Sequence, residues 1–292
     1  MTLNSLLRLM RIPHYTKNFF VFLPLFFSGQ LFVMSAVQRS AVAFLAFCLA
    51  ASSIYILNDI LDREKDRLHP VKRKRPIASG EVSPRTGMVL AAVLALFLFL
   101  ILRNLGSVSV TLSLAAYLVL NIFYVCLGRK WAIVDVCCIA IGFVLRVMAG
   151  NAAVGCAISP WLVMMVFLLS MFLGLGKRWD DLRIIEEEMP VGNIRESLNG
   201  YSRRFVLSSM TFLSAINTIC YIMYTLSPEN VARYGSSYLY ATAFWVLLGN
   251  MRYLQIVLVN QNSMSPTKIL IQDFGIQLCV LIWFVHIGIL LY

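Results

Sequence analysis

The stretch Met88-Val-Leu-Ala-Ala-Val-Leu-Ala-Leu-Phe-Leu-Phe-Leu-Ile-Leu102 contains no charged or polar side chain. A strand of a membrane barrel would alternate apolar and polar residues, whereas this run would be apolar on every face of a helix. A helix needs about 20 largely apolar residues to cross the hydrocarbon core of a bilayer. We therefore predict an all-α protein, a polytopic bundle of helices that spans a membrane.

Other apolar stretches of similar length recur along the chain, and hydrophobic residues make up 60% of the sequence against 13% charged. No polar linker separates two soluble domains, so we expect residues 1–292 to form a single transmembrane domain. Pro24 and Gly29 interrupt the first stretch, which is expected to be kinked or to enter the bilayer without crossing it cleanly. Together the stretches predict about nine spans, near residues 18–36, 41–61, 86–102, 107–127, 131–149, 160–176, 205–226, 237–258 and 269–291.

The net charge of +11 would suit a nucleic-acid-binding protein if the basic residues formed one surface patch. They instead alternate with the spans. With a cytoplasmic N-terminus, only Arg39, Arg103 and Arg233 of the basic residues in the connections fall outside the cell. This is the positive-inside bias of an integral membrane protein, so the expected partner is the bilayer and no nucleic acid.

The first cytoplasmic connection begins with an acidic motif on the end of the second predicted span. At about 100° per residue, Asn58, Asp59, Asp62 and Asp66 would project from one side of a continuous helix. Carboxylates on one face repel each other unless a cation joins them. Mg²⁺ fits, because it takes one or two carboxylates and completes its shell with water and phosphate oxygens. A solvated, charged helix end is the alternative interpretation.

Basic residues follow the acidic motif at once, in Lys72-Arg73-Lys74-Arg75-Pro76. They are either a topology signal or, beside Mg²⁺, a cradle for phosphate groups, because guanidinium groups bind phosphate oxygens in pairs and lysine adds point charge. The second connection, Lys177-Arg178-Trp179-Asp180-Asp181, again mixes carboxylates with cations.

Two further places combine polar residues with the spans. Tyr124, Arg129 and Lys130 close the fourth span, where a membrane-interface belt is the simpler interpretation. Arg146 lies inside a span, which is expensive and typical of a residue that faces a cavity. Asp135 is about 17 Å away along the same helix, too far to pair with Arg146 directly.

The motif Asn58-Asp59-x-x-Asp62-x-x-x-Asp66, followed by Arg75-Pro76-Ile-Ala-Ser79-Gly80, resembles the first aspartate-rich motif of the UbiA superfamily of intramembrane prenyltransferases. Further strings resemble its decaprenyl-phosphate phosphoribosyltransferase branch. They are Lys17-Asn18, Asp66-Arg67-Leu-His69-Pro70-Val-Lys72, Gly142-Phe-Val-Leu-Arg146 and Leu175-Gly176-Lys177-Arg178. Members that use prenyl diphosphates carry a second motif, Asp-x-x-x-Asp, whereas here Asp180 and Asp181 are followed four residues on by Ile184 and Ile185.

The resemblance implies Mg²⁺-dependent transfer of a phosphoribosyl group from phosphoribosyl diphosphate to a polyprenyl phosphate, at the cytoplasmic face of a bacterial inner membrane. It leaves the oligomeric state open. The implied metal ligands are Asn58, Asp59, Asp62 and Asp66. The implied catalytic residues are Asp62, Asp66, Lys177 and Arg178. The implied substrate-binding residues are Lys17, Arg63, Lys72, Arg75, Tyr124, Lys130, Arg146 and Asp181.

Two alternatives remain at this point. One is transfer of a prenyl group from a prenyl diphosphate to a small acceptor, aromatic or other. The other is a carrier or lipid-flipping protein, which would more often show repeats with broken helices and polar groups at the midplane. Here the polar clusters lie toward one face.

The charge distribution predicts that residues 63–85 and 177–204 are cytoplasmic. A cysteine in place of Lys74 should therefore resist an impermeant thiol reagent applied to intact cells, and a cysteine in place of Arg103 should react. Efficient labelling at position 74 from outside would overturn the orientation.

Overall fold

The computed structural model describes residues 3–68, 72–187, 196–259 and 266–291, and its regular elements within these ranges are all helical. The prediction of an all-α bundle is confirmed. Eight described helices are long and apolar enough to cross a membrane, one fewer than the number predicted. They are α3 (Met34–Leu61), α5 (Pro84–Leu105), α6 (Val108–Cys126), α7 (Val134–Val154), α8 (Pro160–Glu187), α9 (Arg203–Leu226), η5 with α11 (Ser237–Thr242 and Ala243–Leu258) and α13 (Phe274–Leu291). His69 and Pro70 of the quoted motif lie outside the described residues.

The missing span is the first one, because residues 18–36 do not form a single helix. The short helix α1 (Leu3–Met10) is followed by the 3₁₀ helix η1 (Ile12–Phe22) and the five-residue α2 (Leu23–Phe27). The chain then turns at Gly29, whose φ of 72° is in the left-handed region, and α3 begins at Met34. Pro24 and Gly29 thus mark the interruption that the sequence predicts.

The 3₁₀ geometry of η1 is visible in its burial pattern. Three residues per turn align positions i and i+3, and Tyr15, Asn18 and Val21 accordingly form its inner row. A second row, also spaced by three residues, is exposed and consists of Pro13, Thr16 and Phe19. The result is a short helix whose inner face carries the amide of Asn18 and the hydroxyl of Tyr15, which hydrogen-bonds Ser52 at 2.9 Å.

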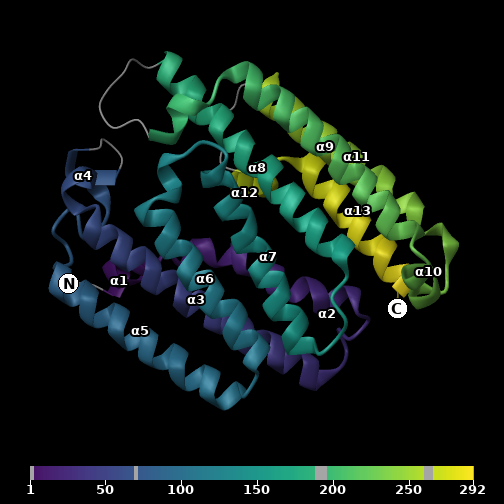
Figure 1. The fold of residues 1–292 in the computed structure, drawn as a ribbon, viewed down its shortest axis with the longest axis horizontal. Coiled ribbons are helices and arrows are strands. Elements are labelled where there is room, and N and C mark those ends of the chain that lie inside the picture. Colours follow the sequence, from purple (N-terminus) through teal and green to yellow (C-terminus); the bar gives the residue numbers. More distant parts are fainter. Residues whose placement is uncertain (1–2, 69–71, 188–195, 260–265, 292) are drawn as a thin grey trace. The chain divides into compact units, whose positions relative to one another are not determined.

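The described chain packs into two compact units. Unit 1 takes in residues up to Arg129 together with Gly142–Ala157. It contains α1 to α6, including α4 (Arg63–Leu68) and the 3₁₀ turn η2 (Lys72–Lys74), and the later part of α7. α3 runs beside α5 (Figure 1), and it also contacts η1, α1 and α6, among others. The unit's core is built from small, aromatic and aliphatic residues such as Ala46, Phe47 and Leu114.

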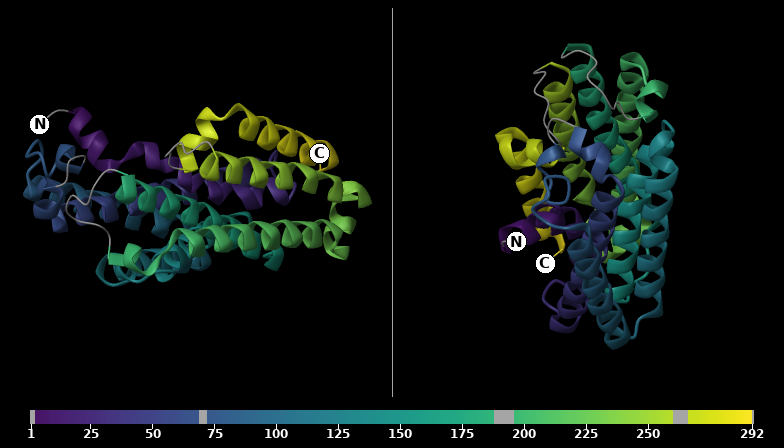
Figure 2. Two further views of the ribbon diagram at one scale, coloured as in Figure 1. Left: turned by 90° about the horizontal axis from the view of Figure 1, so that it is seen from above. Right: turned by 90° about the vertical axis from the view of Figure 1, so that its left-hand side faces the viewer.

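Unit 2 comprises residues 130–141 and most of the chain after Ala157. Besides α8, α9, α11 and α13 it contains η3 in part (Gly128–Lys130), η4 (Glu196–Gly200), α10 (Pro228–Tyr234) and α12 (Pro266–Gln272). α8 runs beside α9, and α11 beside α13 (Figure 2). Phe172, Met210 and Tyr253 lie in its core. That residues 1–292 act as one domain stays a prediction.

A glycine in α7 sets how closely η1 approaches that helix. A Cβ atom built on Gly150 would overlap the backbone carbonyl oxygen of Val21, whose side chain is fully buried. Backbone cannot swing aside as a side chain can, so only glycine fits here.

Gly150→Ala should therefore destabilise the protein by about 1–3 kcal/mol, the usual penalty of overpacking a filled interior. Thermal unfolding of the purified protein in detergent would measure it. The matched control is Gly288→Ala in α13, where a Cβ would meet nothing within 4 Å. It should be neutral or slightly stabilising, because alanine favours helix over glycine. Equal melting temperatures for both variants would contradict the packing argument.

Candidate functional site

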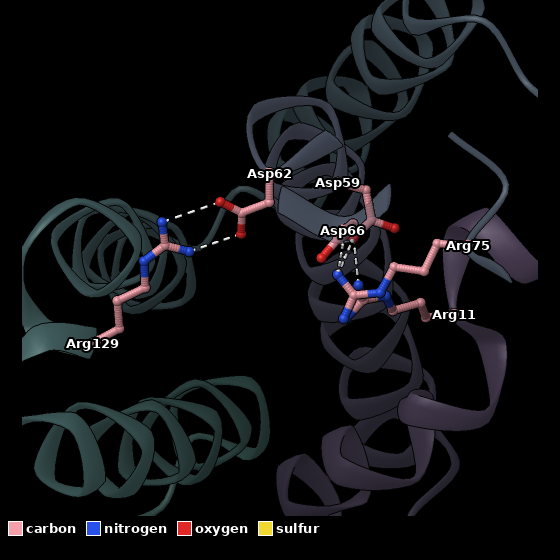
Figure 3. A network of polar contacts seen from close by, with 6 residues as sticks. All are labelled: Arg11, Asp59, Asp62, Asp66, Arg75 and Arg129. Atoms are coloured by element: carbon pink, nitrogen blue, oxygen red, sulfur yellow. Dashed lines mark hydrogen bonds and ion pairs between the residues drawn. The ribbon is translucent and has the colours of Figure 1, made fainter. Parts of the chain in front are cut away.

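Two aspartates of the acidic motif converge on one arginine in unit 1. Arg75 Nη1 lies 3.2 Å from Asp59 Oδ1 and 2.6 Å from Asp66 Oδ2, and both carboxylates are nearly fully buried (Figure 3). Arg11 donates a second, short hydrogen bond to Asp59 Oδ1. Arg11 also stacks over the ring of Tyr55, with 4.7 Å between its Cζ and the ring centroid. We call these four charged residues, Arg11, Asp59, Asp66 and Arg75, the Asp59 cluster.

The third aspartate of the motif points elsewhere. Asp62 accepts two hydrogen bonds from Arg129, at 2.8 Å to Nη1 and 3.1 Å to Nη2, away from Asp59 and Asp66 (Figure 3). This hydrogen bonding raises the pKa of the Arg129 guanidinium. The expectation that all four motif residues share one helix face is wrong for Asp62. The helix α3 ends at Leu61, Asp62 is its C-terminal cap, and Arg129 provides a partner on the other side.

The Asp59 cluster fits a hard divalent cation. Two carboxylates that converge on a single nitrogen atom define a point where positive charge is stabilised, and Mg²⁺ commonly takes one or two carboxylates. Within the described residues, no group of three or more His, Cys, Asp or Glu side chains is arranged to hold a metal ion. A cation here would thus complete its shell with Asn58, which is half-buried beside Asp59, and with water or phosphate oxygens.

A second group of polar residues surrounds Arg146, also in unit 1. Its Nε donates to Asn18 Oδ1 at 2.7 Å, its Nη1 to the Gly142 carbonyl at 2.7 Å and its Nη2 to the Tyr117 hydroxyl at 3.0 Å. Lys17 lies close enough that the positive charges of Arg146 and Arg11, after burial itself, lower its pKa to about 8. The sequence singled out Lys17 and Arg146 separately, and the structure brings them together. We call Lys17, Asn18, Tyr117 and Arg146 the Arg146 cluster.

The third cluster lies in unit 2 and is centred on Asp135. Arg178 Nε donates to Asp135 Oδ2 at 2.8 Å, and both side chains are 1% exposed. Ser197 and Tyr201 donate to the same carboxylate at 3.0 and 2.7 Å. Arg178 Nη1 also holds Asp181 Oδ2 at 2.8 Å. The guanidinium of Arg178 is therefore enclosed by two carboxylates.

The Asp135 cluster supports an unusual turn before α7. Ile133 has a φ of 68°, which is rare for a β-branched residue. Its backbone N–H donates to the Tyr201 hydroxyl at 2.6 Å. Burial, and then the hydrogen bond to Asp135, raise the pKa of Tyr201, so this hydroxyl keeps its proton. Sequence patterns gave no signal for Ser197 or Tyr201, because they are 62 and 66 residues from Asp135.

The remaining predicted site residues lie near these clusters or at helix ends. Arg63 begins α4 and lies 3.8 Å from Glu64, which is 75% exposed and also pairs with Arg67. Lys72 begins η2, and Tyr124 is half-buried near the end of α6. Lys130 and Lys177 are exposed, at the end of η3 and in α8. Glu188 and Pro190 of the second connection lie outside the described residues.

Comparison with known proteins identifies relatives of the whole chain. The sequence model of the UbiA prenyltransferase family matches residues 21–256. A protein of Mycolicibacterium smegmatis named decaprenyl-phosphate phosphoribosyltransferase is 31% identical over 261 residues, which cover 87% of this chain and 80% of the relative. A protein of the same name from Corynebacterium glutamicum is 27% identical, with 96% of this chain and 84% of the relative covered.

The fold has solved counterparts as well. A UbiA homologue from Archaeoglobus fulgidus, solved bound to DMAPP and Mg²⁺, superposes with a TM-score of 0.71. The superposition covers 98% of this chain and 99% of that one, at 17% identity. This likeness establishes the fold.

The Asp135 cluster makes a prediction about stability. Arg178→Ala would leave Asp135 buried without its counter-charge, which typically costs about 3–5 kcal/mol. Lys177→Ala, one residue earlier and exposed, is the matched control and should change stability by less than about 1 kcal/mol. Thermal unfolding in detergent would measure both. If the Arg178 variant were as stable as the control, the ion pair would not be a structural element.

Proposed function

The chain belongs to the UbiA prenyltransferase family, and from this premise we propose that it transfers a 5-phosphoribosyl group from phosphoribosyl diphosphate to a polyprenyl phosphate, releasing diphosphate. The observation that carries the proposal is the Asp59 cluster, in which two arginines bind a pair of buried carboxylates. The names of the relatives that cover most of the chain support the same reaction.

The reaction needs little acid–base chemistry from the protein. The bond between ribose C1 and the diphosphate oxygen breaks with its electron pair on diphosphate, and a bond from C1 to an oxygen of the acceptor phosphate forms. A phosphomonoester has a second pKa near 6, so the acceptor is already a nucleophile at neutral pH. Positive charge develops at C1 as in glycosyl transfer. The protein's task is to bind two anionic substrates together and to stabilise the leaving group.

The Asp59 cluster suits the diphosphate end of the donor. Mg²⁺ held by Asp59 and Asp66, with Asn58 as a further ligand, would neutralise charge on the diphosphate. Asp62 would join these ligands only by turning away from Arg129. Arg75 already lies against both aspartates and can bind phosphate oxygens alongside the metal, with Lys72 and Arg63 at the start of the same connection. The structural neighbour that was solved with DMAPP and Mg²⁺ is in keeping with this assignment.

The end of α8 supports phosphoribosyl rather than prenyl transfer. Prenyl-diphosphate enzymes are expected to place a second pair of carboxylates here, but Asp181 is held by Arg178 and isoleucines occupy the later positions. For Lys177, Lys130 and Tyr124, the family resemblance remains the ground for proposing that they contact substrate. Arg178, because it is enclosed by Asp135 and Asp181, is a positioning residue rather than a substrate contact. The site is proposed to face the cytoplasm of a bacterial inner membrane.

Turnover tests the proposal directly. Purified protein in detergent, given labelled phosphoribosyl diphosphate, Mg²⁺ and polyprenyl phosphates of several lengths, should form a labelled lipid that thin-layer chromatography separates. A parallel reaction offers geranylgeranyl diphosphate with aromatic acceptors. Prenyl transfer without any phosphoribosyl lipid would contradict the proposal and favour the prenyltransferase alternative.

Single carboxylates of the motif should be essential to that turnover. Asp62→Asn and Asp66→Asn should each lower the rate by more than about 100-fold, as loss of one preorganised electrostatic contact typically does. Glu64→Gln is the control, because Glu64 is exposed between them and touches only arginines. Melting temperatures would show that the variants fold. Wild-type rates and wild-type Mg²⁺ dependence in both aspartate variants would contradict the proposed metal site.

A further inference from the structure

Arg146 is a buried cation with no anionic partner. Its side chain is 5% exposed, and its three hydrogen-bond partners, Asn18, Gly142 and Tyr117, are all neutral. Among the described residues, no carboxylate pairs with it. The rings of Tyr117 and Phe143 lie 4.6 and 5.4 Å from its Cζ, which stabilises the guanidinium without cancelling its charge.

Lys17 adds a second cation beside Arg146. No ion pair or hydrogen bond of its ammonium group to a described residue is found, and its lowered pKa reflects burial next to Arg146 and Arg11. Arg11 has its own counter-charge, because Asp59 accepts its hydrogen bond. Lys17 and Arg146 therefore leave about two positive charges in unit 1 without compensation.

This imbalance contrasts with five arginines near the acidic motif that have a carboxylate partner. Those pairs are Arg8 with Glu81, Arg11 with Asp59, Arg67 with Glu64, Arg75 with Asp59 and Asp66, and Arg129 with Asp62. Uncompensated buried charge costs several kcal/mol, so a negatively charged ligand would stabilise Arg146 and the half-buried Lys17 beside it.

We propose that Lys17 and Arg146 form a binding site for a phosphomonoester group. Such a group carries a charge of about −1.5 to −2 at pH 7, which matches the two cations. This inference rests on the proposed function for the identity of the ligand, which has two sources there. One is the phosphate head group of the polyprenyl acceptor, and the other is the 5-phosphate of the donor.

Arg146 lies well inside α7, and its hydrogen-bond partners are not members of the Asp59 cluster. It lies twelve residues beyond Val134, the first residue of α7, which is about 18 Å along the helix axis. Asn18 fixes the guanidinium, and its own amide donates to Cys48 Sγ at 3.2 Å. Lys17 is influenced by the charges of both Arg146 and Arg11, and Arg11 in turn donates a hydrogen bond to Asp59.

Asn18→Asp provides a sharp test, because it supplies the missing counter-charge without changing the size of the side chain. An aspartate oxygen at the position of Asn18 Oδ1 would lie 2.7 Å from Arg146 Nε and compete with a bound phosphate. Isothermal titration with farnesyl phosphate, and separately with phosphoribosyl diphosphate, would measure binding without turnover. We expect at least about a tenfold loss of affinity for one of these two ligands.

Two further variants complete the design. Thr16→Asp adds the same charge on the exposed row of η1 and should change either affinity by less than about twofold, because exposed charge is screened. Lys17→Gln removes the other cation. The ammonium group of Lys17 makes no hydrogen bond to a described residue, so this substitution should not disturb folding, and it tests the inference if Asn18→Asp fails to fold. Farnesol, which has the same chain without the phosphate group, is the uncharged control ligand, and its affinity should not change in these variants.

The pattern of losses identifies the ligand. Weaker farnesyl phosphate binding alone assigns the site to the acceptor head group, and weaker phosphoribosyl diphosphate binding alone assigns it to the 5-phosphate. Unchanged affinity for both ligands in Asn18→Asp and Lys17→Gln would overturn the inference. If affinity falls but no phosphoribosyl lipid forms in the turnover assay, the site stands and the proposed function fails. If the lipid forms while both affinities are unchanged, the reverse holds.

Discussion

A charged side chain near the hydrocarbon core is stable only beside an opposite charge, and in this protein arginine repeatedly meets that need. Asp59, Asp66, Asp62 and Asp135 each accept a hydrogen bond from a guanidinium group. Leaving one of them unpaired would cost several kcal/mol. The exposed pair of Glu64 and Arg67 contributes less to stability, about 0–1 kcal/mol, because water screens its charges.

The pairs join parts of the chain that are far apart in sequence. Arg129 reaches Asp62 across 67 residues, and Arg178 reaches Asp135 across 43. The same contacts fix the ends of α3, α6, α7 and α8, where the candidate chemistry is located. Arginine and aspartate side chains therefore contribute both to the stability of the fold and to the candidate binding site. Arg178 is fully neutralised by carboxylates of the protein. Arg146 has only neutral partners, and we propose that a ligand supplies the negative charge for it and for Lys17.

Much of this was predictable from the sequence, because hydrocarbon imposes a length and a composition on any helix that crosses it. Hydropathy located α3, α5 to α9, α11 and α13, and the aspartate-rich motif located the candidate site. The first predicted span is not a continuous helix, and Pro24 and Gly29 predicted its interruption. The 3₁₀ form of η1 could not be predicted, because average hydropathy does not distinguish a 3₁₀ helix from an α-helix. The predicted direction of the Asp62 side chain was wrong, because the prediction assumed a continuous helix, whereas α3 ends at Leu61. The neutral surroundings of Arg146 depend on Asn18 and Tyr117, which lie 128 and 29 residues away and follow no local pattern.

The 3₁₀ form of η1 also determines how far this segment reaches. A 3₁₀ helix advances about 2.0 Å per residue and an α-helix about 1.5 Å. The 11 residues of η1 therefore extend about 22 Å, the distance that roughly 15 residues would cover as an α-helix. Rewinding to 3.6 residues per turn would shorten the segment and rotate Asn18 off the line that it shares with Tyr15 and Val21. The pitch of one short helix thus sets both the reach of the N-terminal segment and the direction in which its single buried amide faces.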